Sequence, residues 1–267
     1  MDLKLTGKTA LVTGSTAGIG LAISKRLAAE GASVVIVGRS QAKLDEAAKL
    51  VTSAATSKVA PGIRAVLADA ASAEGAAVLH REVPTVDILV NNLGIYESKP
   101  FTDITDADWL KLFEVNVLSG ARLARQYFPG MLERNWGRVI FIASESGLVV
   151  PPDMIHYGMT KTAQLAISRG LANELAGTGV TVNAILPGPT RTEGVEEFLA
   201  DLARTKGIAP DKAEDEFFRL ERPSSLIRRF AEPEEVANVA AYLASPRASA
   251  TTGAAVRVDG GVVNFIA

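Results

Sequence analysis

Short apolar runs alternate with longer segments of helical period along the whole chain, and this alternation restricts the possible folds more than any other feature. Runs rich in Val, Ile and Leu are typical of strands buried on both faces. They cover Thr9 to Val12, Ser33 to Val37, Ile63 to Leu67, Val86 to Val90, Arg138 to Ile142, Val180 to Leu186 and Ala255 to Val258. Helical spacing follows over Ile19 to Ala29, Gln41 to Val51, Asp108 to Glu133, Ile155 to Ala176 and Pro233 to Ala244.

Alternating strands and helices predict a parallel sheet, because parallel neighbours need a crossover long enough to hold a helix. The sequence therefore predicts an α/β fold of one domain over residues 1–267, with a doubly wound parallel sheet covered by helices on both faces. The segment Thr52 to Gly62 is interpreted as a loop before the third strand, since Ser, Thr and Ala precede Pro61-Gly62.

Composition excludes several classes of protein. Of the 267 residues 48% are apolar, and the formal charge of -2 provides no broad basic surface for nucleic acid. There is no cysteine, which excludes disulfides, thiolate zinc sites, iron–sulfur clusters and a cysteine nucleophile. With only two histidines, His80 and His156, no metal site is expected. The first residues do not resemble a signal peptide and no apolar stretch has the length of a membrane span, so a cytoplasmic location is expected.

The pattern changes between Glu193 and Arg222, where two short helices are predicted on either side of Gly207 and Pro210. Helical spacing is carried by Val195, Phe198, Leu199 and Leu202, and then by Ala213, Phe217 and Leu220. A long insertion near the carboxyl ends of the strands often becomes a lid over a ligand crevice. An additional helical pair that simply packs on the core is an equally good interpretation.

A glycine-rich turn lies between the first predicted strand and the first predicted helix, with the spacing Gly-x-x-x-Gly-x-Gly. Glycine permits positive φ and close approach of a diphosphate, which the free amides and the dipole of a helix N-terminus attract. The predicted cofactor contacts are Gly14, Ser15, Thr16, Gly18, Ile19 and Gly20. A methyltransferase cofactor, or close helix–strand packing alone, would also explain this turn.

The second predicted strand ends at Gly38-Arg39. An acidic residue at this point would bind the ribose 2'-hydroxyl of NAD and would repel the 2'-phosphate of NADP. Gly38 has no carboxylate, and the guanidinium of Arg39 suits a phosphate. NADP(H) is therefore favoured as the cofactor, with NAD(H) possible, because an arginine after a strand is also a common solvent-exposed residue.

Tyr157 and Lys161 are four residues apart in a predicted helix, so the phenol and the ammonium can face one space. A neighbouring cation favours the phenolate and makes the tyrosine usable as a general acid or base. This spacing alone carries little weight, but other motifs accompany it. They are Thr13-Gly14-x-x-x-Gly18-Ile19-Gly20, Asn91-Asn92-x-Gly94, Asn116, Ser144, Tyr157-x-x-x-Lys161 and Pro187-Gly188-x-x-x-Thr192.

In this order and at these distances, the motifs resemble those of the short-chain dehydrogenase/reductase family, including its 3-oxoacyl carrier-protein reductases, over nearly the whole chain. The resemblance implies a Rossmann-like fold and hydride transfer between a nicotinamide and a carbonyl carbon. It implies that Tyr157 exchanges a proton with the substrate oxygen, Ser144 polarises that oxygen, Lys161 binds the nicotinamide ribose, and Asn116 holds a water in a proton relay. It also assigns cofactor contacts to Asp69, Asn91, Gly94, Tyr157, Lys161, Pro187, Gly188 and Thr192.

Each assignment has a structural alternative: Asn116 could bond its own helix, Ser144 could cap a turn, Asp69 could be an ordinary acid after a strand, and Pro187-Gly188 could be a plain turn. The register among the motifs favours the functional interpretation of Ser144, Tyr157, Lys161 and Asn116. The sequence departs from the family where Leu93 and Thr190 replace the common alanine and aliphatic residue, and in a short segment between Asp69 and Val86.

The substrate pocket is predicted from the residues around these motifs. It includes Ser146, Val149, Met154, His156 and Pro189, together with Phe198, Phe217 and Phe218 of the insertion. The phenylalanines indicate either an apolar substrate or core packing, and His156 either contacts substrate or faces water. Glu145 either points away or binds a polar substrate group.

Three functions remain open at this stage: a ketone reductase or alcohol dehydrogenase using NADP(H) or NAD(H), a noncatalytic dinucleotide-binding regulator, and a methyltransferase. The intact Ser144, Tyr157 and Lys161 favour the enzyme. Alanine, leucine and glycine at contact spacing in the long helices, with an apolar tail over Val262 to Ala267, indicate a homo-oligomer, either a dimer or a tetramer.

Overall fold

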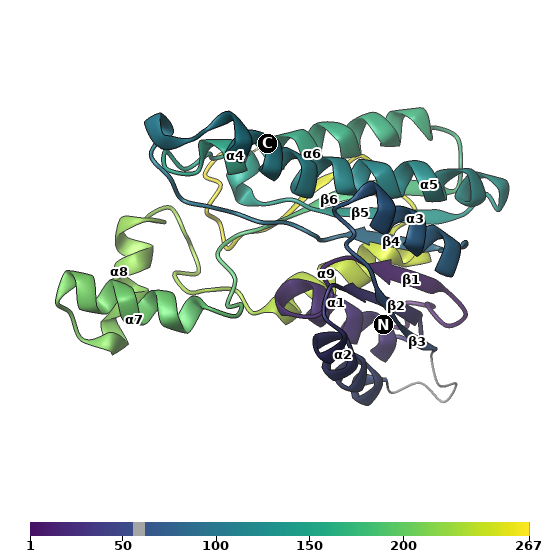
Figure 1. The fold of residues 1–267 in the computed structure, drawn as a ribbon, viewed down its shortest axis with the longest axis horizontal. Helices are drawn as coiled ribbons and strands as arrows, with labels where there is room; N and C mark the ends of the chain where they lie inside the picture. The colour runs from purple at the N-terminus through teal and green to yellow at the C-terminus, as the bar shows by residue number, and fades with distance from the viewer. Residues whose placement is uncertain (56–61, 267) are drawn as a thin grey trace.

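Seven parallel strands form one sheet in the computed structural model, in the order β3-β2-β1-β4-β5-β6-β7 (Figure 1). The structure describes residues 1–55 and 62–266. The strands are β1 (Thr9–Val12), β2 (Ser33–Gly38), β3 (Ile63–Leu67), β4 (Ile88–Asn91), β5 (Gly137–Ile142), β6 (Val180–Pro187) and β7 (Ala255–Val258). This arrangement confirms the predicted α/β fold with a doubly wound parallel sheet.

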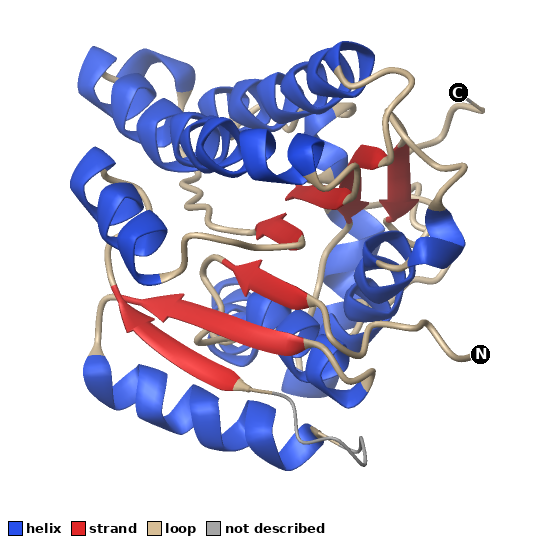
Figure 2. Ribbon diagram, turned by 90° about the vertical axis from the view of Figure 1, so that its right-hand side faces the viewer, coloured by secondary structure: helices blue, strands red, loops and turns tan. Residues whose placement is uncertain are grey.

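Helices cover both faces of the sheet, as Figure 2 shows. One layer consists of α1 (Gly18–Ala29), α2 (Gln41–Ala54) and α9 (Pro233–Ala244), and the other of α3 (Ala73–Glu82), α4 (Asp106–Phe113), α5 (Ser119–Glu133) and α6 (Ile155–Glu174). Within residues 1–55 and 62–266, no helix has both the length and the apolar composition needed to cross a membrane.

Two apolar cores lie on the two faces of the sheet. In β1, Ala10 and Val12 belong to the core under α1 and α9, whereas Leu11 belongs to the core under α5. Successive side chains of a strand point to opposite faces, so a strand covered on both sides must be apolar at every position. This is why the runs of Val, Ile and Leu predicted the strands well.

The structure differs from the sequence-based prediction at several boundaries. The strand expected from Val86 begins at Ile88. Asp87 just before it bonds Thr9 and Arg138 through its backbone, and its side chain accepts a hydrogen bond from the backbone nitrogen of Thr9 at 2.9 Å. The helix α2 continues to Ala54, so the first residues of the predicted loop Thr52 to Gly62 are helical, and residues 56–61 lie outside the described part. The short helix α3, capped by the Ser72 side chain, was not predicted.

The helix predicted over Asp108 to Glu133 is divided. It consists of α4, a π-helical turn (Glu114–Leu118) and α5. The side chain of Asn116 in this turn bonds the backbone of Ile95, with Oδ1 accepting at 2.8 Å and Nδ2 donating at 2.8 Å. Periodicity cannot reveal one additional residue in a helical turn, and such π-turns are frequent at functional sites.

The insertion forms two helices, α7 (Val195–Lys206) and α8 (Ala213–Leu220), which project to one side of the sheet (Figure 1). The two predicted helices are thus confirmed, and Gly207, with φ of +64°, ends the first of them. The rings of Phe217 and Phe230 stack with centroids 5.1 Å apart, and Phe218 packs edge-on against both. Phe217 and Phe218 therefore belong to an apolar core of the insertion. Of the two interpretations of these phenylalanines, apolar substrate or core packing, the structure supports core packing.

Candidate active site

The candidate site lies at the carboxyl ends of the central strands. The strand order reverses between β1 and β4, so the loops that follow these two strands diverge and leave a crevice between them. The glycine turn follows β1, Asn91 ends β4, Ser144 follows β5 and Pro187 ends β6. The fold thus brings motifs from the whole length of the chain to one edge of the sheet.

The glycine turn has the backbone that a phosphate site needs. Gly14 and Gly18 adopt φ of +59° and +50°, and a Cβ at Gly20 would lie 2.2 Å from the Gly14 carbonyl oxygen. The helix α1 begins at Gly18, and the Ala17 that precedes it provides no side-chain cap for its first amides. These amides and the helix dipole remain available to a diphosphate, so the turn fits the phosphates of a dinucleotide.

Thr13 and Asn92 hold this turn against β4, a role that the sequence did not reveal. Thr13 Oγ1 accepts the backbone N–H groups of Asn92 and Leu93, both at 3.0 Å. Asn92 Nδ2 donates to the carbonyl oxygens of Thr13 at 3.0 Å and of Gly14 at 3.1 Å. Thr13 and Asn92 belong to the quoted motifs, but the motifs did not predict these hydrogen bonds, because the partners are about eighty positions apart in the sequence.

The predicted adenosine contacts surround the ends of β2, β3 and β4. The Asn91 side chain is buried, and neither its nitrogen nor its oxygen has a hydrogen-bond partner among the described residues. Burying an amide without partners is costly, so the Asn91 side chain fits an adenosine cofactor well. Arg39 is exposed just after β2, and Asp69 Oδ1 accepts the N–H of Ala71. Ser15 differs from the others because its hydroxyl accepts the N–H of Val37 at 2.7 Å, which leaves only its backbone for a cofactor.

The predicted contacts near the nicotinamide end follow β6. A Cβ at Gly188 would lie 2.7 Å from the carbonyl oxygen of Asp259, so glycine is required there by the approach of the chain after β7. Thr192 lies beside the glycine turn, with Cγ2 3.2 Å from where a Gly18 Cβ would stand. Thr190 donates to the Gly188 carbonyl oxygen at 2.9 Å and bridges to Ala231. The residues along the crevice thus fit a nicotinamide dinucleotide at both ends.

Ser144 stands directly after β5 and caps a short 3-10 helix (Glu145–Gly147), where its Oγ accepts the N–H of Ser146 at 3.1 Å. The same Oγ donates to Glu145 Oε2 at 2.5 Å. Ser144 therefore caps a turn, as the structural alternative supposed, and also faces the site. Its proton points to a carboxylate in this structure.

Tyr157 lies in the first turn of α6, with its ring edge-on to that of Tyr96 at 6.2 Å. Burial, together with the negative charge of Glu145, raises the pKa of Tyr157 above its usual value, while the Ser144 hydroxyl and Arg222 act in the opposite direction. The net direction is the reverse of the one expected from a neighbouring ammonium, because burial and the charge of Glu145 outweigh the Ser144 hydroxyl and Arg222. A phenol with a raised pKa keeps its proton at neutral pH but is a weaker acid, so transfer of this proton requires groups that stabilise the phenolate.

Lys161 is buried one helical turn after Tyr157, with Nζ 5.6 Å from the centre of the phenol ring. Burial lowers the pKa of Lys161 to about 8, and the charge of Glu145 opposes this effect. Lys161 Nζ donates to the Ile142 carbonyl oxygen at 3.0 Å and to Gln164 Oε1 at 3.1 Å. A Cβ at Gly94 would lie 3.4 Å from this ammonium, so Gly94 leaves space above it.

Gln164 connects Asn116 to Lys161 and was missed by the sequence analysis. Its Nε2 donates to the backbone oxygen of Asn116 at 2.6 Å while its Oε1 accepts from Lys161. The Asn116 side chain is fully used by Ile95 and by Thr160 Oγ1, to which Nδ2 donates at 3.0 Å. The carboxamide of Gln164 thus connects the backbone of Asn116 to Lys161 directly, and the water predicted at Asn116 stays a prediction. A polar residue three positions after the lysine of the motif was the signal that could have revealed it.

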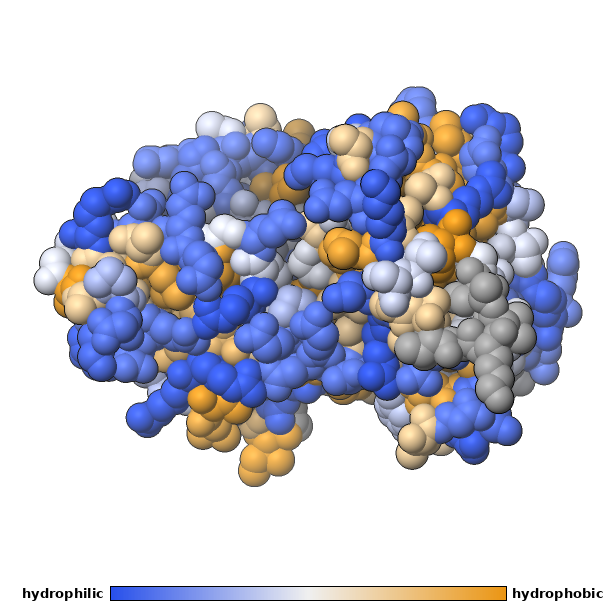
Figure 3. Space-filling model, turned by 90° about the horizontal axis from the view of Figure 1, so that it is seen from below, coloured by the Kyte–Doolittle hydropathy of each residue, from blue (hydrophilic) through white to orange (hydrophobic). Residues whose placement is uncertain are grey.

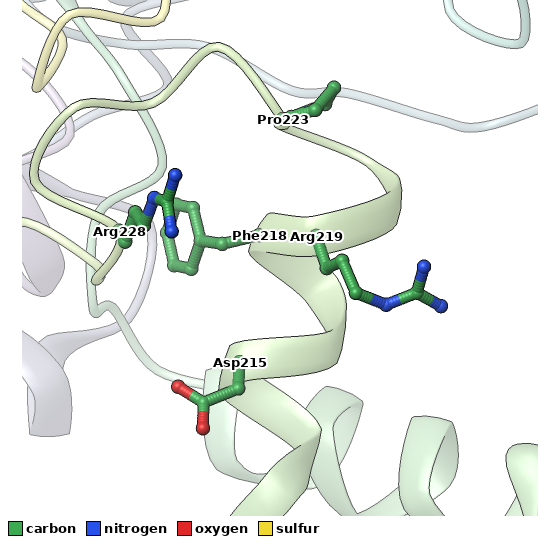
Figure 4. A pocket seen from close by; sticks show the side chains of 5 residues that line it. All are labelled: Asp215, Phe218, Arg219, Pro223 and Arg228. Carbon is green, nitrogen blue, oxygen red and sulfur yellow. The ribbon is translucent and has the colours of Figure 1, made fainter.

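Glu145 and Arg222 connect the insertion to the catalytic residues. The Glu145 side chain is 7% exposed, and its Oε1 lies 3.4 Å from Arg222 Nε, just beyond the end of α8. A cavity of 390 Å³ lies farther out, between α8 and the segment that follows it (Figure 4). It is lined by Asp215, Phe218, Arg219, Pro223 and Arg228, and by none of the four predicted catalytic side chains.

The remaining predicted pocket residues divide into buried and exposed ones. His156 is fully buried in α6, with neither ring nitrogen hydrogen-bonded among the described residues, so it does not face water. Ser146 is buried as well, whereas Val149 and Phe198 are exposed, and Met154 and Pro189 lie in between. Over residues 1–55 and 62–266, no cluster of three or more His, Asp or Glu side chains could hold a metal ion.

Comparison with known proteins identifies the family of the chain. A family model described as enoyl-(acyl carrier protein) reductase matches residues 14–263. The chain is 48% identical to an uncharacterized oxidoreductase, YvaG, of Bacillus subtilis (strain 168), over 100% of both chains. It is 36% identical to a D-beta-hydroxybutyrate dehydrogenase of Cupriavidus necator, over 97% of this chain and 99% of the other.

Solved structures agree with both the fold and the family. The L-sorbose reductase of Gluconobacter frateurii, crystallised with NADPH and L-sorbose, aligns over 100% of both chains with a TM-score of 0.91 and 33% identity. The sheet order, the residues at its carboxyl edge and these similarities define one class of protein. The chain belongs to the short-chain dehydrogenase/reductase family and is an oxidoreductase.

Proposed function

We propose that the protein is an NADP(H)-dependent oxidoreductase that interconverts a ketone and a secondary alcohol. The observation that supports this most is the meeting of Ser144, Tyr157 and Lys161 at the carboxyl edge of β5 and the start of α6. A proton donor, a second hydroxyl and a buried cation on one side of the crevice are the groups needed where a carbonyl oxygen gains negative charge.

Each residue of the site has a distinct proposed role in the reaction. NADPH, when bound along the crevice, supplies the hydride that the carbonyl carbon accepts. Tyr157 donates its proton to the carbonyl oxygen in reduction and removes it in oxidation. The Ser144 hydroxyl orients that oxygen, and Lys161 stabilises the phenolate left behind while binding the nicotinamide ribose. Gln164 and the Ile142 carbonyl oxygen fix the Lys161 ammonium.

NADP(H) is the proposed cofactor, with NAD(H) as the alternative. Arg39 is exposed at the end of β2, with no acidic residue beside it in Gly38-Arg39-Ser40, so a 2'-phosphate would meet a guanidinium there. The L-sorbose reductase that aligns with the whole chain binds NADPH. A noncatalytic dinucleotide-binding regulator is a second candidate, but nothing in the site favours it.

The two helices of residues 193–222 are proposed to act as a substrate lid, because Arg222 at their end contacts Glu145 beside the catalytic serine.

Subunit association is proposed on the α4–α5 side, where Phe101, Leu110 and Leu118 are exposed. Figure 3 shows the molecule from below, the side away from α4 and α5, where the apolar side chains lie in separate groups among hydrophilic ones. Light scattering at micromolar concentration should give the mass of a dimer or tetramer, and the mass of a monomer would refute this association.

Replacing Tyr157 with Phe tests the proposed function. The variant keeps the ring and its packing against Tyr96 but has no proton to donate, so turnover of ketones with NADPH should fall by roughly 10³-fold or more. NADPH binding, followed by fluorescence titration, should change little. The matched control is Tyr242→Phe on the exposed surface of α9, which should keep full activity. A Tyr157→Phe enzyme that retained most of its rate would refute the acid–base role.

A further inference from the structure

The carboxylate of Glu145 stands beside the catalytic serine without an evident part in the reaction. Its side chain is 7% exposed, in a turn fixed between β5 and α6. Burying a carboxylate is costly unless its oxygens are hydrogen-bonded or paired. Both oxygens are provided for here: Oε2 accepts from Ser144 Oγ at 2.5 Å, and Oε1 lies 3.4 Å from Arg222 Nε.

In this arrangement Glu145 opposes the chemistry. Ser144 has a single hydroxyl proton, and while that proton is donated to Glu145 it is not available to a carbonyl oxygen. The charge of Glu145 also disfavours the phenolate of Tyr157. The ion pair with Arg222 uses only one oxygen of the Glu145 carboxylate. It therefore does not explain why the other oxygen faces Ser144.

A substrate hydroxyl can replace the Ser144 hydroxyl as the hydrogen-bond donor to Glu145 Oε2. A carbonyl oxygen that accepts from Ser144 Oγ at about 2.8 Å lies within roughly 5 Å of Glu145 Oε2, since Ser144 and Glu145 are already in contact. A hydroxyl on the carbon next to the carbonyl falls within this range. It would donate to Oε2 and release the Ser144 proton for the carbonyl oxygen.

We propose that Glu145 is a specificity-determining residue that selects neutral ketones with a hydroxyl on the adjacent carbon, the class that includes polyhydroxylated ketones. The proposal rests on the proposed function, which supplies the reaction. The carbonyl carbon accepts a hydride from NADPH, the carbonyl oxygen takes the Tyr157 proton, and the products are a vicinal diol and NADP⁺.

Charge at the site supports a neutral substrate. A carboxylate accepts hydrogen bonds and donates none, so a substrate carboxylate at this position would be repelled. Arg222 does not reverse this, because its Nε faces Glu145 and its Nη1 donates to the Glu221 carbonyl oxygen at 2.8 Å. The Phe217 ring packs against Phe218 and Phe230, so it is not available to an apolar substrate.

Matched ketones test the proposal. Hydroxyacetone and butan-2-one differ by one hydroxyl in place of a methyl group, and pyruvate carries a carboxylate in place of the whole hydroxymethyl group. The ratio of kcat/KM for hydroxyacetone over butan-2-one should fall by roughly tenfold or more when Glu145 is replaced by Met. The rate with butan-2-one should be kept or raised, because the Ser144 proton is released, and the rate with pyruvate should rise.

The ratio in the variant is the decisive quantity, because a hydroxyl also makes a carbonyl more reactive without any enzyme. Glu97→Met, which removes a carboxylate 3.8 Å from His156 without touching Ser144, is the matched control and should leave the ratio unchanged. If the unpaired Arg222 prevents Glu145→Met from folding, the double variant with Arg222→Met removes both charges and should show the same loss of selectivity.

The outcomes separate the two proposals. An unchanged ratio in Glu145→Met, or a wild-type preference for pyruvate, refutes the role of Glu145 while ketone reduction stands. Loss of the selectivity in Glu145→Met but not in Glu97→Met supports it. Turnover of none of the three substrates refutes ketone reduction and the selectivity together.

Discussion

At the scale of single residues, Gln164 gives the buried Lys161 a fixed environment. A buried ammonium needs acceptors, and Lys161 has two: the Ile142 carbonyl oxygen at 3.0 Å and Gln164 Oε1 at 3.1 Å. Gln164 is itself held by its bond to the backbone oxygen of Asn116 at 2.6 Å. We therefore propose that the carboxamide is a positioning residue, which would act on the reaction through Lys161.

We expect Gln164→Met to lower kcat for ketone reduction about tenfold, since a hydrogen bond to a charged group contributes about 1.5–3 kcal/mol. Removing an acceptor disfavours the ammonium, so the pKa of Lys161 should fall below its value of about 8. The decrease of kcat on the alkaline side of the pH profile should then occur at a lower pH in Gln164→Met than in the wild type. The pH profile of kcat measures this shift.

Two variants separate positioning from stability. Gln164→Glu keeps an acceptor and adds a negative charge, so it should move the same limb of the profile to higher pH. Gln126→Met in α5, where a buried amide oxygen has no partner among the described residues, should not move it. A Gln164→Met profile superimposable on that of the wild type would show that Gln164 only fills space.

At the scale of elements, Arg191 contacts both helices of the insertion and the start of α9. Arg191 Nη1 and Nη2 contact Glu196 of α7 and Glu214 of α8, each at 2.5 Å, and Nε lies 3.6 Å from Glu232 at the start of α9. Its guanidinium also lies over the Phe230 ring, 5.5 Å from the centre. Each half of the insertion thus depends on the same side chain.

Arg191→Met should loosen the insertion without unfolding the sheet. Three carboxylates lose their cation, so amides of α7 and α8 should exchange hydrogen roughly tenfold faster or more, while those of β4 and β5 keep their protection. The matched control is Arg204→Met, which removes an exposed pair with Asp201 inside α7 and should change little. Equal exchange of the insertion in both variants would show that Arg191 does not anchor it.

At the scale of the whole molecule, the crevice couples cofactor binding to stability. A ligand that binds only the folded state at 100 times its Kd stabilises it by about 2.7 kcal/mol. NADPH should therefore raise the melting temperature by on the order of 5 °C or more. NADH at the same concentration should raise it less, because Arg39 has no phosphate to bind.

Replacing Arg39 with Asp should reverse this order, since a carboxylate repels the 2'-phosphate and accepts from the 2'-hydroxyl. Arg81→Asp, the same change on the exposed surface of α3, should preserve it. Differential scanning fluorimetry of the three proteins measures the effect. The same preference in the Arg39→Asp protein as in the wild type would show that Arg39 does not bind the phosphate.

The sheet could be predicted because its determinants are local. β1, β3 and β7 have the predicted bounds. Ala10, Leu11 and Val12 of β1 are buried inside the sheet, whereas β3 and β7 lie at its edges and keep exposed residues among their apolar ones. The residues of the candidate site could be predicted because they belong to motifs with fixed spacing, and the structure brings Ser144, Tyr157, Lys161 and Asn116 together as the register among the motifs implied.

Tertiary structure alone decided how the side chains at the site are used. Gln164, Arg222 and Thr13 meet partners 48, 77 and 79 positions away, and no spacing in the sequence predicts such contacts. The direction of the Tyr157 pKa depends on burial, which exists only after packing. A sequence specifies which residues are apolar and which can react, whereas the acceptor that each buried donor finds depends on how distant segments come together.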